Sequence, residues 1–322
     1  MSISVSVIIC TANPRMDILQ RALDCIEQQT LGHTRYEVVV VDNNSEPPLS
    51  AEALRKDREM TLRVIRQPRQ GLSYARVAGI RAATGRLMVF VDDDNFLDSR
   101  YLENALRIAD AEPHIGAFGG ITEGILERPI GKWKSRLLPY LGVRDYGPEP
   151  ITSTADHWGK WEPIGAGMVT RRDVAEKFAE LIESIPHAGT LGRRGSDLLS
   201  GEDSLFARIA NRLGYACSYQ PSLKLQHFIK KERLKLKYLA RLIKGHGRSY
   251  VVLQRVLGRP ADPISLPNCM ARMLYRLKTA GTIGVMMWFW DVGYMIEART
   301  PSRPETIEPF FHPVPATQGG SQ

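Results

Sequence analysis

The sequence contains few cysteines and no closely spaced pair of them. Its four cysteines, Cys10, Cys25, Cys217 and Cys269, lie far apart and form no C-x-x-C pair. Zinc sites and the disulfide frameworks of small secreted domains both require close, regular cysteine spacing, so neither is indicated. A reduced, cytoplasmic compartment fits this cysteine usage best.

Long hydrophobic runs and an N-terminal targeting pattern are also lacking. The first ten residues have no basic region of the kind that begins a signal peptide, and their β-branched residues favour a buried strand. The most apolar stretch, residues 283–296, is shorter than the about 20 residues that span a bilayer and contains Asp291. We therefore predict no transmembrane helix.

Acidic residues are scarce in one segment only. The 322 residues include 43 Lys or Arg and 35 Asp or Glu, which gives a formal net charge of +8. Residues 224–259 hold eleven of these bases and a single acid, Glu232, so the rest of the chain is slightly acidic. A surface that is basic throughout is thereby excluded, and we expect no nucleic-acid partner. A content of 43% hydrophobic and 24% charged residues excludes disorder.

The first third of the chain alternates between predicted strands and helices. The strands are residues 3–10, 36–41, 61–66 and 86–91, and the helices between them are residues 16–29, 51–59 and 71–83. Strands that are apolar on both faces and separated by helices indicate a parallel sheet in a doubly wound α/β fold. Ligands of such sheets bind beyond the carboxyl ends of the strands, where Asp42 and Asp92-Asp93-Asp94 fall.

The pattern is less regular after about residue 112. We predict strands at residues 116–121 and 163–170, an amphipathic helix at 203–213, and two short strands, 215–219 and 223–226, before His227. Residues 232–257 are mostly helical, with interruptions at Gly245 and Gly247. A Pro-rich tail after Arg299 is expected to be disordered.

Three consecutive carboxylates follow the predicted strand 86–91. Like charges a few ångströms apart repel, so Asp92-Asp93-Asp94 calls for a cationic partner. A divalent metal would neutralise them together with a phosphate-bearing substrate. In an extended segment Asp92 and Asp94 would point to one side and Asp93 to the other. The alternative is an exposed acidic turn.

Several short motifs in this order resemble the family 2 inverting glycosyltransferases of the GT-A fold. The matching residues are Val5 to Cys10 with Thr11 and Asn13, Val39 to Ser45, Gly71-Leu72-Ser73-Tyr74-Ala75-Arg76, Ala83-x-Gly85, Phe90-Val91-Asp92-Asp93-Asp94, Gly165-Ala166-Gly167-Met168 with Arg171-Arg172, and Gly201-Glu202-Asp203-Ser204-Leu205 with Arg208 and Gly214. The resemblance covers about residues 3–230. It implies a Rossmann-like, mostly parallel central sheet flanked by helices, here with a C-terminal helical extension.

The resemblance also implies a division of the chain and an activity. Residues 1–98 would form the nucleotide-sugar-binding half, 99–230 the acceptor-binding and catalytic half, 231–300 a basic helical extension and 301–322 the tail. The implied activity is metal-dependent, inverting transfer of a sugar from a nucleotide-diphosphate donor to a hydroxyl of a glycan or lipid-linked glycan. The implied cofactor is Mn²⁺ or Mg²⁺.

The family implies roles for the acidic residues, position by position. Asp203 matches the general base, which removes the proton from the acceptor hydroxyl, and Glu202 beside it would orient the acceptor or cap the helix. Asp94 would bind the metal, with Asp92 on the ribose or the metal shell and His227 as a further ligand, since imidazole suits Mn²⁺. His246 is a weaker candidate. The alternative for Glu202-Asp203 is a helix start, where the helix dipole favours acids.

The donor site of the family is implied at eight positions: Thr11, Asn13, Asp42, Asn43, Gly71, Arg76, Asp92 and Asp93. Arg76 would contact the diphosphate or the nucleotide. Many members have two acids in the nucleoside turn and an aromatic residue near the opening loop, where this chain has Asp42-Asn43 and Ala12. Because an amide both donates and accepts, the base is less constrained, and dTDP and GDP stay open beside UDP, the default.

The acceptor site is implied at Trp158, Trp161, Gly165 and Ala166. Indoles stack on sugar faces, so the two tryptophans are predicted to form an acceptor platform, with core packing as the alternative.

The basic segment mixes leucines with lysines and arginines, as do helices that lie on anionic membrane surfaces. The aromatic residues of 285–290 would add interfacial anchoring. This pattern would suit a peripheral enzyme of cell-envelope polysaccharide synthesis on the inner face of the cell membrane. The alternatives are a helix that packs its apolar side on the sheet, and bases that close over the donor diphosphate.

Two other classes of function compete with the glycosyltransferase. A nucleotidyltransferase shares the α/β sheet and the acidic metal site, but Thr11-Ala12-Asn13-Pro14 is not the Gly-rich phosphate loop that such enzymes carry after the first strand. A non-catalytic basic module that binds membrane or nucleic acid would have no use for the acidic cluster.

Overall fold

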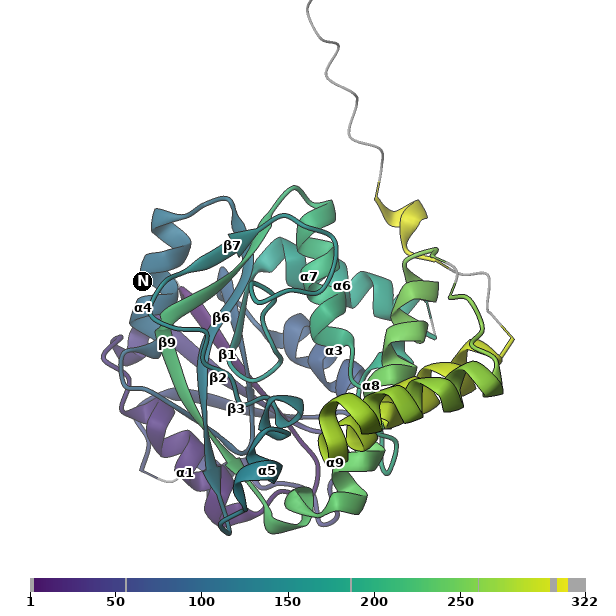
Figure 1. The fold of residues 1–322 in the computed structure, drawn as a ribbon. Helices are drawn as coiled ribbons and strands as arrows, with labels where there is room; N and C mark the ends of the chain where they lie inside the picture. The colour runs from purple at the N-terminus through teal and green to yellow at the C-terminus, as the bar shows by residue number, and fades with distance from the viewer. Residues whose placement is uncertain (1–2, 56, 186, 260, 302–305, 312–322) are drawn as a thin grey trace, which may run out of the picture.

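The computed structural model describes residues 3–311 except 56, 186, 260 and 302–305. Within these residues one mixed sheet has the order β3-β2-β1-β4-β8-β6-β9-β5, with β7 paired to β9 (Figure 1). The strands are β1 (Val5–Thr11), β2 (Tyr36–Asp42), β3 (Thr61–Arg66), β4 (Leu87–Asp92), β5 (Asn95–Leu97), β6 (Ile115–Leu126), β7 (Ile151–Ser153), β8 (Met168–Arg171) and β9 (Ala216–Ile229).

Helices cover both faces of the sheet (Figure 1). They are α1 (Met16–Glu27), α2 (Ala51–Arg55), α3 (Leu72–Ala82), α4 (Tyr101–Ala111), α5 (Lys132–Ser135), α6 (Arg172–Ser184), α7 (Glu202–Arg212), α8 (Leu236–Val256) and α9 (Leu266–Ala298). Alternate residues of β1 point to opposite faces of the sheet. Ile8 packs with α3, α6 and α7, whereas Val7 packs with α1 and α4.

The strands β3, β2, β1 and β4 are parallel neighbours, as the apolar runs predicted. Every residue of β2 is buried, because helices lie on both sides of it. The second half departs from this pattern: β8 runs antiparallel to β4 and β6, while β6 and β9 are parallel. The predicted α/β fold with a mostly parallel sheet is confirmed, and its edge beyond β4 is mixed.

One long strand, β9, replaces the two short strands predicted before His227. Its pairing with β6 is interrupted by a bulge, since Gly119 pairs with Tyr219 but Ile121 pairs with Lys224. The bulge wraps around Gly120, where a Cβ would lie 2.0 Å from the Leu223 carbonyl oxygen. The sequence pattern was broken by this bulge, although the strand continues through it.

The acidic triplet is a turn and not an extended segment. β4 ends at Asp92, and the Asp92 N–H donates to the Asn95 side-chain oxygen at 3.1 Å. β5 begins at Asn95 and pairs antiparallel with β9, so that Asn95 lies opposite His227. The predicted alternation of the three carboxylates was therefore based on the wrong local geometry.

Helix α8 is continuous, so the predicted interruptions at Gly245 and Gly247 were wrong. The two glycines instead permit close approach of neighbouring backbone. A Cβ at Gly245 would lie 2.4 Å from the Leu198 carbonyl oxygen, and one at Gly247 would lie 2.0 Å from that of Trp290. Glycine costs a helix about 1 kcal/mol relative to alanine, and here it allows α8 to pack directly on α9.

Helix α9 is a hairpin of two limbs, because Gly281 has the non-helical angles φ 55° and ψ −136°. Residues 266–280 form the first limb and 282–298 the second (Figure 1). The Trp288 indole N–H donates to the Cys269 carbonyl oxygen. A Cβ at Gly284 would lie 1.9 Å from the Arg276 carbonyl oxygen. These contacts show that the limbs run antiparallel in close contact.

The apolar side of α8 is buried. Leu239, Leu242 and Ile243 pack in one cluster with the turn η2 (Leu138–Leu141) and with Ile283 and Met286 of the second limb of α9. This side of the basic segment is therefore not available to a membrane, and the alternative of a packed helix is the one the structure shows. The aromatic residues Trp288, Phe289 and Trp290 are likewise engaged in packing, within the hairpin and against α8.

Part of the predicted tail is ordered. Ile307 is fully buried and donates its N–H to the Val256 carbonyl oxygen at the end of α8. The remainder of that prediction, residues 302–305 and 312–322, lies outside the described residues. No helix of the described chain combines the length and the hydropathy needed to cross a bilayer.

Candidate active site

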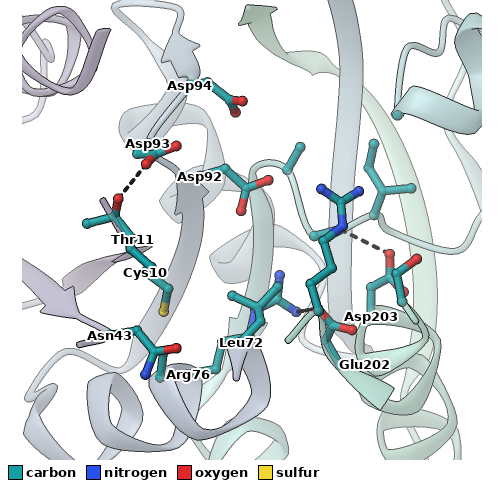
Figure 2. A pocket seen from close by; sticks show the side chains of 18 of the residues that line it. Cys10, Thr11, Asn43, Leu72, Arg76, Asp92, Asp93, Asp94, Glu202 and Asp203 are labelled. Atoms are coloured by element: carbon teal, nitrogen blue, oxygen red, sulfur yellow. Dashed lines mark hydrogen bonds and ion pairs between the residues drawn. The ribbon is translucent and has the colours of Figure 1, made fainter. Parts of the chain in front are cut away.

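A cavity of about 520 Å³ opens where β1 and β4 end and where α3 and α7 begin. Cavities of this size hold nucleotide-sized ligands. Figure 2 shows the acidic triplet on one side of the cavity and Glu202 with Asp203 on the other. Most of the predicted site residues line it: Thr11, Asn13, Asn43, Gly71, Arg76, Asp92, Asp93, Asp94, Gly165, Ala166, Glu202, Asp203 and His227.

The three aspartates have different surroundings. Asp93 accepts a hydrogen bond from the Thr11 hydroxyl at the end of β1. Burial and the neighbouring charge of Asp94 raise the pKa of Asp93 to about 6, against the effect of that hydrogen bond. Asp92 points into the cavity in Figure 2. The triplet therefore offers the cavity carboxylates of unequal acidity.

Asp94 is held between an imidazole and a guanidinium. Its Oδ1 lies 3.4 Å from His227 Nε2, and its Oδ2 accepts from Arg233 Nη1 at 3.2 Å. Burial alone would raise the pKa of Asp94, but the charges of His227 and Arg233 lower it to about 2. Asp94 is thus an anion that already has a cation beside it. Its partner Arg233 belongs to the turn η4 (Lys231–Leu234) at the start of the basic segment.

The chemistry of these groups fits a divalent metal. In the described part of the chain, no group of three or more His, Cys, Asp or Glu side chains is placed to hold one. Asp94 and His227 nevertheless offer a carboxylate and an imidazole, and the His227 Nδ1 atom is buried without a hydrogen-bond partner. Mn²⁺ and Mg²⁺ commonly take only one or two protein ligands and complete their shell with water and substrate phosphate.

Glu202 and Asp203 occupy the first turn of α7 but face different neighbours. Glu202 is buried 3.6 Å from Arg76 Nη1, and burial raises its pKa against the charge of Arg76. Asp203 is partly exposed, and its carboxylate accepts from the Ser204 N–H at 2.8 Å and from the Gly165 N–H at 3.3 Å. These hydrogen bonds hold the Asp203 carboxylate at the cavity wall.

The polar side chains of the turn after β2 form hydrogen bonds with nearby backbone groups. Asp42 does not line the cavity, because its carboxylate accepts from the Ser45 and Leu49 N–H groups. Both Asn43 amide hydrogens bond backbone carbonyls, those of Gln67 and Arg69, and its oxygen accepts from the Gly71 N–H. In this structure Asp42 and Asn43 thus shape the loop that follows β2, since buried backbone groups require partners.

The two tryptophans of the predicted acceptor platform do not line the cavity. Trp158 is 68% exposed, and Trp161 packs over Gly159 and against the core. Next to Trp161 in the sequence, Glu162 forms a buried ion pair with Arg208 and accepts from the Ser204 hydroxyl. This pair ties the Gly165 loop to α7. Trp161 packs against the core, as its alternative predicted, and an acceptor role of the two tryptophans stays a prediction.

Sequence reasoning missed Arg193 and Arg233 of the cavity wall, and it named His246 only as a weak candidate. Arg193 comes from the loop before α7, and the charges of Tyr238, Asp92 and Glu202 raise its pKa although burial opposes them. His246 comes from α8, and burial together with Arg193 lowers its pKa to about 4, which keeps the imidazole neutral. No motif marks Arg193, and only the fold brings it to the carboxylates.

Comparisons with known proteins agree with this architecture. The model of glycosyl transferase family 2 matches residues 6–179, more than half of the chain. Glycosyltransferase AglE of Haloferax volcanii is 32% identical over 213 residues, which are 56% of this chain and 69% of AglE. The chain spans less than a third of the length of four other curated relatives.

Solved structures of glycosyltransferases share the fold. Mannosyltransferase PcManGT from Pyrobaculum calidifontis, in complex with GDP-Man and Mn²⁺, has a TM-score of 0.54 at 19% identity over 94% of this chain and 77% of its own. GalNAc-T7 with UDP, GalNAc and Mn²⁺ has a TM-score of 0.55 at 16% identity over 94% of this chain and 59% of its own. The predicted GT-A fold is confirmed. The chain belongs to glycosyl transferase family 2.

Proposed function

We propose that the protein is a metal-dependent, inverting glycosyltransferase that moves a sugar from a nucleotide-diphosphate donor to a hydroxyl of a glycan or lipid-linked glycan. One observation carries the proposal: a single cavity places the Asp92–Asp94 triplet with His227 opposite Asp203. The first group suits a diphosphate with its metal, and the second suits the removal of a proton. An active-site base and a phosphate site across one cavity are what this transfer requires.

The donor would lie along the ends of β1 and β4. Asp94 and His227, with Asp92 nearby, would hold Mn²⁺ or Mg²⁺. When bound, the metal supplies positive charge that stabilises the departing nucleoside diphosphate. The loop shaped by Asn43 would receive the nucleobase. Gly71 is the residue before α3 and has no side chain, so the donor could approach the first turn of that helix.

The acceptor hydroxyl would lie against Asp203. Its oxygen forms a bond to the anomeric carbon while the bond from that carbon to the donor phosphate oxygen breaks. The hydroxyl proton moves to an Asp203 carboxylate oxygen. Glu202 would act indirectly, because its ion pair with Arg76 fixes the start of α7 beneath Asp203.

A thermal-shift screen of nucleotide sugars with and without Mn²⁺ tests this function. We expect one UDP-, GDP- or dTDP-sugar to raise the melting temperature by a few degrees, and only when Mn²⁺ is present. A ligand at 100 times its Kd stabilises the native state by about 2.7 kcal/mol. The absence of a shift with every nucleotide sugar would contradict the proposal. Stabilisation by a nucleoside triphosphate alone would favour a nucleotidyltransferase.

Arg233 is expected to compete with the metal for Asp94. In Arg233→Gln the carboxylate loses its cationic neighbour, so we expect Mn²⁺ to bind up to about tenfold more tightly in the absence of nucleotide. Donor affinity is expected to fall, because a cation beside the diphosphate is lost. Calorimetric titrations with Mn²⁺ and with donor measure both changes, and Lys231→Gln, an exposed base in the same turn, is the control. Unchanged Mn²⁺ affinity in Arg233→Gln would refute the competition.

A further inference from the structure

The first limb of α9 carries an exposed apolar stripe. Leu266, Met270, Leu274 and Leu277 are 55%, 40%, 61% and 48% exposed, and their spacing of four, four and three residues places them on one side of the helix. No other helix of the described chain exposes as many large apolar side chains. The stripe therefore calls for an occupant.

The stripe is held on a well-defined scaffold. The inner side of the limb packs on the second limb, where Cys269 is buried and accepts from the Trp288 indole. Arg272 and Arg276 reach across the hairpin to Asp291, which is fully buried, at 3.1 and 2.7 Å. A buried carboxylate that two guanidinium groups satisfy fixes how the limbs pair. The stripe consequently faces outward in one fixed orientation.

The charge around the stripe is net positive. Residues 263–291 contain Arg272, Arg276, Lys278 and one acid, Asp291, which pairs with the two arginines. Lys235 and Lys237, at the start of α8, are further exposed bases of this C-terminal region. Apolar side chains with flanking cations complement a bilayer surface that contains anionic lipid.

The hairpin also adjoins the cavity. Ile283 and Met286, just beyond the Gly281 bend, pack on the η2 turn with Leu137 and Leu141. Residues Pro139, Tyr140 and Leu141 of the same turn line the cavity. A surface bound by the hairpin would thus lie beside the site where sugar is transferred.

We propose that the stripe docks the enzyme on an anionic lipid bilayer and that the sugar acceptor is anchored in that bilayer. The second clause rests on the proposed glycosyltransferase function. A second copy of the chain is the other occupant to weigh, but a stable protein interface uses about 20–30 residues on each side. A stripe of four side chains is too small for such an interface. In a dimer the flanking bases of the two copies would also repel each other.

Co-sedimentation of the full chain with vesicles tests the docking. We expect binding to vesicles of phosphatidylglycerol and phosphatidylcholine in equal parts, weakened by salt, and little binding to pure phosphatidylcholine. The double variant Leu274→Ser, Leu277→Ser should bind at least about tenfold more weakly, since two apolar side chains lose their burial in lipid. Met16→Ser, at a similarly exposed residue on α1, is the matched control and should bind like the unmodified protein.

Two results would overturn the docking. One is the absence of sedimentation of the unmodified protein with anionic vesicles, and the other is full binding by the double variant with an unchanged circular dichroism spectrum. A dimer in light scattering that the double variant abolishes, without lipid binding, would assign the stripe to a second copy instead. The nucleotide-sugar thermal shift is measured on the same variants. Its absence in the unmodified protein would refute the proposed function and the acceptor clause, but not the lipid binding.

Discussion

Asp203→Asn is expected to abolish sugar transfer while the protein still binds its donor. The amide keeps the shape of the side chain, and its oxygen can still accept from the Ser204 N–H, but it cannot take up the acceptor proton. Loss of general-base catalysis lowers kcat by about 10²–10⁴-fold. Steady-state kinetics measure kcat, and the nucleotide-sugar thermal shift verifies that donor binding persists.

The chain offers a matched control for this substitution. Asp173 occupies the first turn of α6, as Asp203 does in α7, and it also accepts from the next N–H, that of Val174, at 2.9 Å. Asp173→Asn therefore removes the same negative charge from a helix N-terminus at a residue outside the cavity lining, and it should leave kcat unchanged. Full activity in Asp203→Asn would contradict the assignment of Asp203 as the general base. Loss of kcat in Glu202→Gln alone would transfer that role to Glu202.

Asp94→Ala is expected to remove the metal-dependent part of donor binding. The substitution deletes the carboxylate that His227 and Arg233 now contact, and with it the hard oxygen ligand that Mn²⁺ or Mg²⁺ prefers. We expect Mn²⁺ to enhance donor affinity in the unmodified protein and to have no effect in the variant, a difference of at least about tenfold in Kd. Isothermal titration of the donor with and without Mn²⁺ measures it.

Two further variants separate the metal role from a loss of folding. Asp94→Asn keeps the size of the side chain and a hydrogen-bond acceptor for Arg233, so it should fold while still losing the metal effect. Asp110→Ala removes an exposed acid that pairs with Arg86 outside the cavity, and it should behave like the unmodified protein. An Asp94→Asn enzyme with the full Mn²⁺ effect would contradict the metal assignment.

The proposed docking moves the expected membrane contact from the basic segment around α8 to the first limb of α9. The sequence pattern pointed to the basic segment around α8, because leucines alternate there with lysines and arginines. In the structure Leu239 and Leu242 of α8 fill a core, and most of the exposed large apolar side chains of this region belong to the first limb of α9. Amphipathic patterns mark a buried side equally well whether protein or lipid covers it.

Most of the candidate site was predicted from residues that end a strand or begin a helix. Asp92 and Asp203 line one cavity because both lie at the sheet edge where ligands of α/β proteins bind. Asp42 and Trp161 lie outside the cavity. The Asp42 carboxylate instead accepts from the Ser45 N–H, and Trp161 packs against the core. Arg233 and Arg193 could not be placed from sequence, since no local pattern tells which of many surface bases folds inward.

By itself the sequence determined the alternation of buried strands and helices, and it did so for a local reason. Runs such as residues 36–41 are apolar on both faces and bury both only between two layers of helices. The tertiary structure alone decided the continuity of β9 through its bulge, the direct packing of α8 on α9, and the meeting of Asp94 with His227 and Arg233. These features depend on backbone approach and on pairing between distant segments. In each of these features the stabilising free energy comes from contacts between residues that are distant in sequence. The local sequence pattern therefore could not predict them.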